Sequence, residues 1–276
     1  MKHRQPMLFG NTPGATIMRR LMAIAAIAIG AASGPPVGGA CAAEVKVLAA
    51  LAVQDALTPL AAQFASQSGH AVQAGYSTVG AIRKRLAGGE TADVVVLTSE
   101  AIDEMVRAGE LVAGSEAPVA ATRTGLAIRA GAAAPDISTL EKFRAALLAA
   151  RSVAYTDPRT GGAFGTYFAK ELERMGILDA VNAKAVLRRG SHEIVKAVAG
   201  GEAELGVTFI STIVSTPGLA VAGPLPPPLL GTEKFSVGVL RDTAARAAAV
   251  DFAEWLSGPA SIDRWKAAGF DVPTTH

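Results

Sequence analysis

The chain has 276 residues, of which 50% are hydrophobic and 18% are charged, so it is long enough for one large domain or two modest domains, each with its own core. Four of its 26 basic residues and none of its 24 acidic residues lie within 1–43. The rest of the chain therefore has 22 basic and 24 acidic residues, a balance that argues against nucleic acid as a partner.

The first 43 residues have the pattern of a secretory signal peptide. Met18–Gly30 has a basic head and a short, wholly apolar run, and the small residues that follow offer cleavage after Ala42 or Ala43. The apolar run is too short to span a bilayer as a helix. We therefore predict that residues 1–43 are removed and that the protein is periplasmic. Met18 is an alternative start of the chain.

The single cysteine, Cys41, lies in the predicted cleavage region, so we expect no disulfide within the mature chain. Lipidation of Cys41 is an alternative, and it would require cleavage directly before this residue. Residues Gly38–Ala40 lack the large aliphatic residue that lipidation signals usually carry. The sequence therefore favours a free protein over a lipid-anchored one.

From Glu44 onward, short apolar runs alternate with amphipathic stretches, which is typical of an α/β fold. The first series predicts strands at Val45–Leu51, Ala71–Tyr76 and Asp93–Leu97, and helices at Gln54–Ser68, Val79–Ala87 and Ala101–Ala108. Repeated strand–helix units predict a parallel sheet with helices on both faces. Ligands of such sheets bind at the carboxyl ends of the strands, here the loops at 50–53, 77–80 and 98–100.

A second α/β series follows an extended stretch at Pro118–Ala130. It predicts strands at Val153–Tyr155, Ala185–Leu187 and Leu205–Thr208, and helices at Leu140–Ala149, around Tyr167–Met175 and at His192–Ala199. Phe235–Leu240 is extended again, and two amphipathic helices, Ala244–Leu256 and Pro259–Ala268, end the chain.

This order predicts two α/β lobes joined by two extended crossings. We assign residues 44–121 and 236–276 to lobe 1 and residues 122–235 to lobe 2, with 1–43 as the signal peptide. Each lobe is expected to hold a mixed, mostly parallel sheet flanked by helices, with the two crossover strands as a hinge. Two lobes around a ligand cleft are typical of a hinge-closing receptor, for which a monomer is the default state.

The most informative stretch is Val153–Ile177, where a strand, a tight turn and a glycine-rich segment lead into a helix. The first turn of a helix has unpaired N–H groups and partial positive charge, and Gly161, Gly162 and Gly165 would let an anion approach them. The spacing matches neither the nucleoside-triphosphate loop nor the dinucleotide fingerprint. An anion site and a purely structural turn both remain open from these residues alone.

Four stretches resemble the periplasmic molybdate-binding proteins of ABC importers. They are Ala92–Leu97, Tyr155–Gly162 followed by Tyr167–Lys170, Glu204–Val207, and Leu256–Ala260 ahead of Gly269-Phe270. The resemblance extends from about Glu44 to the C-terminus. It implies a type II-like, two-lobe periplasmic binding protein that closes on a small oxyanion such as molybdate or tungstate. It also implies an ABC permease subunit in the inner membrane as partner.

The expected ligand shell departs from that of the family, in which hydroxyls and backbone amides hold the oxyanion. The family's hydroxyl positions correspond here to Ala52, Val79 and Phe209. Each lost neutral hydrogen bond would cost about 1 kcal/mol of binding free energy, so the loss of three would raise the dissociation constant roughly 100-fold. The backbone amides of Gly80, Gly162 and Ala163 do not depend on side-chain identity and stay as expected donors.

A small organic carboxylate is the alternative ligand. Arg123, at the entry of the first crossing, would make a bidentate contact to a carboxylate, and Thr160 would donate a hydroxyl; a structural role for each is also open. The full set of expected ligand-binding residues is Leu51, Ala52, Ser77, Thr78, Val79, Gly80, Arg123, Thr160, Gly161, Gly162, Ala163 and Phe209.

Little in the sequence indicates catalysis. None of the four histidines is paired at metal-ligand spacing, and no Gly-x-Ser-x-Gly motif is present. We therefore expect a binding protein without catalytic residues, metal or cofactor. A periplasmic ligand-sensing module is a further alternative, because the same fold serves regulators.

Overall fold

The computed structural model describes residues 42–160, 163–229 and 231–273. Their strands are β1 (Glu44–Ala50), β2 (Ala71–Ser77), β3 (Val94–Thr98), β4 (Ala117–Arg129), β5 (Val153–Thr156), β6 (Ala185–Arg188), β7 (Leu205–Phe209), β8 (Leu219–Pro224) and β9 (Thr232–Val239). Their helices are α1 (Gln54–Ser68), α2 (Val79–Ala87), α3 (Ser99–Arg107), α4 (Leu140–Ala149), α5 (Ala163–Arg174), α6 (Leu178–Asn182), α7 (Ser191–Ala199), α8 (Ile210–Val214), α9 (Arg246–Ser257) and α10 (Pro259–Ala267), with 3-10 turns η1 (Leu51–Val53) and η2 (Pro158–Thr160).

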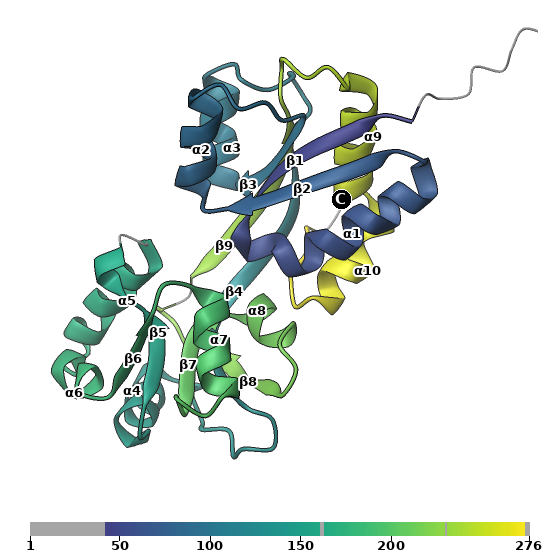
Figure 1. The fold of residues 1–276 in the computed structure, drawn as a ribbon. Helices are drawn as coiled ribbons and strands as arrows, with labels where there is room; N and C mark the ends of the chain where they lie inside the picture. Colours follow the sequence, from purple (N-terminus) through teal and green to yellow (C-terminus); the bar gives the residue numbers. More distant parts are fainter. Residues whose placement is uncertain (1–41, 161–162, 230, 274–276) are drawn as a thin grey trace, which may run out of the picture. The chain divides into compact units, whose positions relative to one another are not determined.

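The first group of strands is built on β1, which pairs in parallel with β2 on one side and β3 on the other; β9 adds antiparallel to β3 (Figure 1). Val94–Leu97 is buried throughout, which explains its continuous rather than alternating apolar pattern. Helices α1, α9 and α10 cover one face around Phe64, Phe252 and Trp265. Helices α2 and α3 cover the other face around Ile82.

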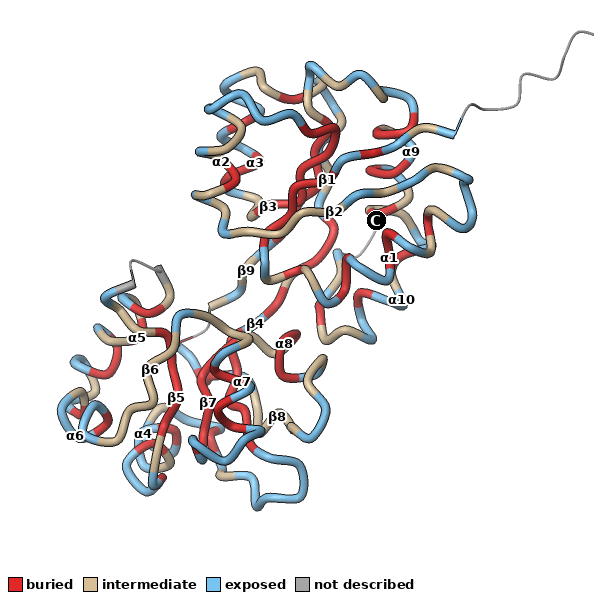
Figure 2. The backbone as a smooth tube through the Cα atoms, in the orientation of Figure 1, coloured by how far each residue is buried: buried red, intermediate tan, exposed pale blue. Residues whose placement is uncertain are grey.

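The second group is built on β5, which pairs in parallel with β6 and β7; β4 lies antiparallel to β7 and β8. Helices α4, α5 and α6 pack on one face through Phe143, Phe168 and Val181. Helices α7 and α8 pack on the other face through Ile194 and Ile213. The buried tube segments in Figure 2 follow these strands and the inward sides of their helices.

Strands β4 and β9 pair with each other and run between the two groups, so the strand order is β2-β1-β3-β9-β4-β7-β5-β6, with β8 on β4. This arrangement confirms the predicted mixed α/β architecture with flanking helices, two lobes and two crossings. The described strand pairs are four parallel and four antiparallel, because β4 and β9 run antiparallel to their neighbours. Each hydrophobic cluster among the described residues takes its buried members from one predicted lobe, except that Phe235, predicted in lobe 2, packs in the cluster of lobe 1. The exact lobe limits, 121/122 and 235/236, stay a prediction.

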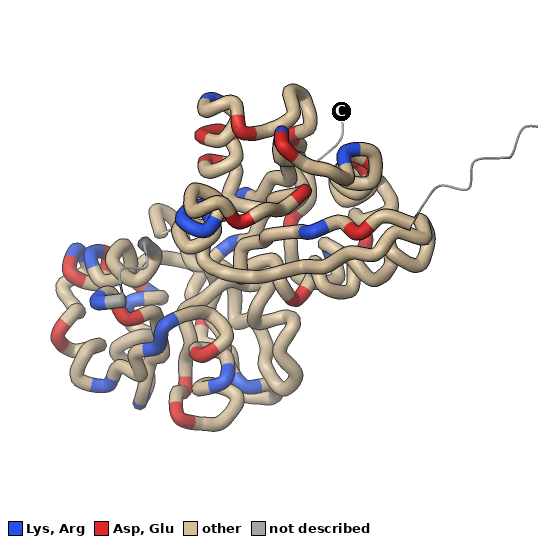
Figure 3. The backbone as a smooth tube through the Cα atoms, turned by 45° about the horizontal axis from the view of Figure 1, so that its top comes forward, with Lys and Arg blue, Asp and Glu red and all other residues tan. Residues whose placement is uncertain are grey.

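Charges of both signs are interspersed over the helices of both groups in Figure 3. Several are paired on the surface, as in Arg85 with Glu90 and Arg151 with Glu204. Such exposed pairs contribute little to stability, because solvent and salt screen their charges.

Candidate functional site

The predicted ligand residues of lobe 1 lie together at the carboxyl edge of its sheet. Ala50, the last residue of β1, pairs with Ser77, the last residue of β2, so the segments that follow the two strands begin side by side. After β1 the chain enters η1, where Leu51 is 41% exposed and Ala52 is half-buried. After β2 it enters α2 at Val79.

The first turn of α2 offers backbone donors rather than side-chain hydroxyls. Thr78 is the N-cap residue, and its Oγ1 accepts a hydrogen bond from the Ala81 N–H at 3.3 Å. The N–H groups of Val79 and Gly80 have no acceptor within the helix. A side chain at Gly80 would meet no atom within 4 Å, so this position is not packed against another element.

The predicted residues of lobe 2 follow β5 and β7 at the carboxyl edge of the second sheet. Thr156 ends β5 in register with Arg188, which ends β6. The chain then passes through η2, which ends at Thr160, and α5 begins at Ala163. Gly161 and Gly162 lie outside the described residues, as do the side chains of Thr160 and Ala163.

Two features fix this turn. Arg159 donates to the Asp157 carboxylate, with Nε–Oδ1 at 3.0 Å, and this bond holds the pKa of Asp157 below its ordinary value. Gly165 packs so closely that a Cβ would lie 2.7 Å from the Thr156 carbonyl oxygen. The glycine predicted to expose amides thus also permits contact between α5 and β5.

Phe209, at the end of β7, presents an aromatic surface where the family has a hydroxyl. It pairs with Thr124 across β4 and is half-buried. Its ring centroid lies 6.2 Å from that of Phe164, which in turn stacks on Phe168 at 6.0 Å. Aromatic rings therefore flank the end of β7.

Arg123 lies on the crossing strand β4 and is already engaged. Its Nε donates to Asp271 Oδ2 at 3.1 Å, and the two side chains are 44% and 60% exposed. Among the described residues, no hydrogen bond or ion pair involves the two terminal nitrogens of its guanidinium. Sequence reasoning had no signal for this pair, because 148 residues separate the partners.

Sequence reasoning also missed a contact between the starts of α1 and α7. His192 Nε2 lies 3.1 Å from Asp55 Oδ2, and each side chain is partly exposed. Asp55 follows Ala52 by three residues, while His192 follows β6. The contact thus joins an element beside the lobe 1 ligand residues to one at the carboxyl edge of lobe 2.

One carboxyl group on the crossing has a shifted pKa. Glu233 lies on β9 opposite Thr122 of β4. Burial raises the pKa of Glu233, and the nearby charge of Glu100, in the first turn of α3, raises it further. Its carboxylate has no hydrogen bond or ion pair to a residue that the structure describes.

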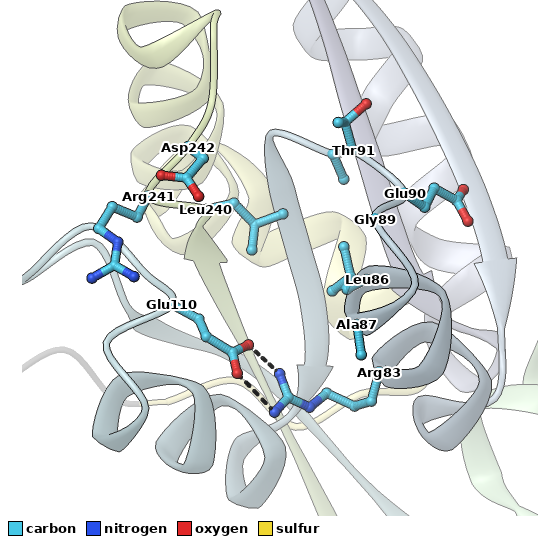
Figure 4. Close-up of a pocket in the computed structure, with 11 residues that line it drawn as sticks. Arg83, Leu86, Ala87, Gly89, Glu90, Thr91, Glu110, Leu240, Arg241 and Asp242 are labelled. Carbon is cyan, nitrogen blue, oxygen red and sulfur yellow. Dashed lines mark hydrogen bonds and ion pairs between the residues drawn. The ribbon is translucent and has the colours of Figure 1, made fainter.

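A pocket of about 340 Å³ lies elsewhere in lobe 1, between the end of α2 and the segment after β9 (Figure 4). Arg83 and Glu110 form a double hydrogen bond along its wall, with Nη2–Oε1 at 3.1 Å. Its lining contains none of the predicted ligand residues; it consists of Arg83, Leu86, Ala87, Gly89, Glu90, Thr91, Ala92, Glu110, Leu240, Arg241 and Asp242. This pocket and the predicted ligand site are therefore different places.

Within the described parts of the chain, His, Cys, Asp and Glu side chains do not gather in groups of three or more that could hold a metal ion. The same residues contain no helix that is long and apolar enough to cross a membrane.

Comparison with known proteins gives a family and a shared fold. The profile of the family described as "Bacterial extracellular solute-binding protein" matches residues 45–271. Aconitate isomerase from a Pseudomonas species is 35% identical over 147 residues, which are 53% of this chain and 54% of that protein. The chain thus spans about half the length of this curated relative.

Among solved structures, a substrate-binding domain described as belonging to a molybdenum ABC transporter from Clostridium difficile has a TM-score of 0.67 at 16% identity, over 84% of this chain and 100% of that one. The Azotobacter vinelandii periplasmic molybdate-binding protein has a TM-score of 0.65 at 23% identity, over 83% of this chain and 100% of that one. The sulfate-binding protein SubI from Mycobacterium tuberculosis has a TM-score of 0.62 at 15% identity, over 84% of this chain and 88% of that one. At these identities the likeness concerns the fold alone.

Proposed function

Because the chain belongs to the bacterial extracellular solute-binding protein family, we propose that it is a periplasmic receptor that closes its two lobes on a small organic carboxylate. It would then deliver this ligand to an ABC permease in the inner membrane and act as a monomer. The signal peptide at 1–43 belongs to the same proposal. Mass spectrometry of the protein recovered from periplasm should give an N-terminus at Ala43 or Glu44.

The observation that carries the choice of ligand is the apolar side chain at each position where the resemblance to the molybdate-binding proteins implies a hydroxyl. In lobe 1 these are Ala52 and Val79, although Ser77 and Thr78 still place hydroxyls at the start of α2. In lobe 2 the position is Phe209, whose ring lies near that of Phe164. A tetrahedral oxyanion needs donors around all four oxygens, because an unpaired acceptor in a desolvated site costs free energy. A carboxylate concentrates its acceptors at one end and leaves a carbon skeleton to contact apolar walls.

Arg123 is the side chain that we propose as the carboxylate partner. Asp271 occupies only its Nε, and the two terminal nitrogens have the fork geometry for a bidentate contact. The 35% identical relative supports the same ligand class, since its name refers to aconitate, a tricarboxylate.

A thermal-shift panel on residues 44–276 tests the proposal. It would hold citrate, trans-aconitate and malate beside molybdate, tungstate, sulfate and phosphate. A ligand that binds only the folded state raises the melting temperature by mass action. We expect a carboxylate to give the largest shift, and Arg123→Ala to reduce that shift while Arg151→Ala, a matched exposed arginine paired with Glu204, leaves it unchanged. A response to molybdate and tungstate alone would instead favour the oxyanion receptor.

The same relative favours a second candidate, an isomerase that acts on such a carboxylate, because its printed name describes an enzyme. Against it, the solved structures of similar fold are binding proteins. Proton NMR of trans-aconitate incubated with catalytic amounts of the protein separates the two. The receptor should leave the spectrum unchanged, whereas an enzyme would produce the cis isomer over many turnovers.

A further inference from the structure

The contact between Asp55 and His192 is a side-chain bridge between the two predicted lobes. Asp55 lies in the first turn of α1, and His192 is the second residue of α7. Their carboxylate and imidazole approach to 3.1 Å although 137 residues separate them. The two helices belong to different hydrophobic clusters, α1 to the one around Phe64 and α7 to the one around Ile194.

This bridge differs from the ion pair of Arg123, which also crosses the predicted lobe limit. Arg123, which bonds to Asp271, lies on the crossing strand β4 itself. A hinge motion changes distances least at the crossing and most at the edges that face each other. Asp55 and His192 lie on helices outside the two crossing strands, so separation of the lobes by a few ångströms would break their contact but spare the pair at Arg123.

The bridge also lies beside the proposed ligand site. Asp55 follows η1, which contains Leu51 and Ala52. His192 follows β6, whose last residue is in register with Thr156 at the start of the predicted anion turn. Around Asp55, the Tyr76 hydroxyl is bonded to Thr58 at 2.8 Å, and burial raises the pKa of Tyr76, so this hydroxyl stays neutral beside the carboxylate.

We propose that Asp55 and His192 are positioning residues for ligand capture: their bond forms when the lobes close and slows ligand release by holding them closed. This inference rests on the proposed function, in which the lobes close on a ligand. The bond is partly exposed, so its removal should change the open–closed equilibrium by about two- to five-fold rather than by orders of magnitude.

The first test measures lobe separation without any ligand. Residues 44–276 contain no cysteine, so cysteines at the exposed positions Ala62 on α1 and Ala145 on α4 can carry spin labels for pulsed electron–electron resonance. We expect Asp55→Ala and His192→Ala each to shift the distance distribution to longer values, and the double variant to match the single ones. Asp136→Ala, which breaks the Lys142 pair within lobe 2, is the control and should leave the distribution unchanged.

The second test measures release of trans-aconitate by stopped-flow competition. Each variant should raise the dissociation rate about two- to five-fold and leave the association rate and the melting temperature close to wild type, a pattern that a merely structural role would not give. Asp55→Asn, which keeps an acceptor for His192, should raise the dissociation rate less than Asp55→Ala does. Unchanged distance distributions in the variants overturn the proposal whether or not a carboxylate binds. Failure of trans-aconitate to bind the wild-type protein bears on the proposed ligand instead.

Discussion

Phe209 of β7 lies with its ring centroid 6.2 Å from that of Phe164, the second residue of α5. The two rings come from segments that the sequence predicts on the ligand-binding edge of lobe 2. They form an apolar surface at the start of α5, where hydroxyl groups would serve an inorganic oxyanion. This surface is the main reason for preferring a ligand with a carbon skeleton.

Restoring the family's hydroxyls should shift the ligand preference. We predict that Ala52→Ser combined with Phe209→Tyr raises the affinity for molybdate by about 5- to 30-fold, because each new neutral hydrogen bond contributes about 0.5–1 kcal/mol. Calorimetry with molybdate checks this value, with Ala62→Ser on the exposed side of α1 as the control. An affinity equal to that of the control variant would mean that these positions do not contact the ligand.

Two glycines of the site should respond to alanine in opposite ways. At Gly165, a Cβ would lie 2.7 Å from the Thr156 carbonyl oxygen, so Gly165→Ala should lower the free energy of unfolding by about 1–3 kcal/mol and weaken ligand binding by displacing the start of α5. At Gly80 there is open space, so Gly80→Ala should raise the free energy of unfolding by about 0.5–1 kcal/mol. Urea unfolding of both variants measures the difference. Equal effects would contradict the packing described at Gly165.

Glu233 should make stability depend on pH in a defined direction. Burial and the charge of Glu100 raise the pKa of Glu233 in the folded state, so the unfolded chain releases this proton at lower pH than the folded chain does. As pH rises from the ordinary glutamate value through the raised one, the folded state therefore loses stability. Glu233→Gln removes this loss.

We predict that Glu233→Gln raises the melting temperature by about 1–3 °C at pH 7 and that this gain disappears at pH ~3, below the ordinary glutamate pKa, where the wild-type carboxyl is protonated in both states. Calorimetric scans at the two pH values measure it. Glu254→Gln, at an exposed position on α9, is the control. A variant that is no more stable than wild type at pH 7 would contradict the described burial.

Much of the fold follows from local sequence pattern. The valine-rich run Val94–Leu97 forms the predicted strand, and all four of its residues are buried. The amphipathic stretch Gln54–Ser68 forms the predicted helix, and its buried residues recur every three to four positions. Two short helices, α6 and α8, were missed, since five residues are too few to show a helical period. Strand β9 begins at Thr232, three residues before its predicted start, because the polar residues Thr232–Lys234 pair with β4 at the crossing.

The site was less accessible to prediction than the fold. The loops at 50–53, 77–80 and 98–100 were expected at the carboxyl ends of β1, β2 and β3 and lie there, because parallel pairing brings these strand ends together. The partners of Arg123 and His192 could not be foreseen, since Asp271 and Asp55 reach them only through the three-dimensional arrangement. Whether the predicted residues hold a ligand stays a prediction.

The most direct test of the account compares two dissociation constants by calorimetry, with trans-aconitate and with molybdate, on the same preparation of residues 44–276 at the same salt concentration. We predict that the tricarboxylate binds at least tenfold more tightly, because apolar side chains replace the hydroxyls at the site. Tighter binding of molybdate would contradict the account and would mean that backbone amides alone suffice for an oxyanion.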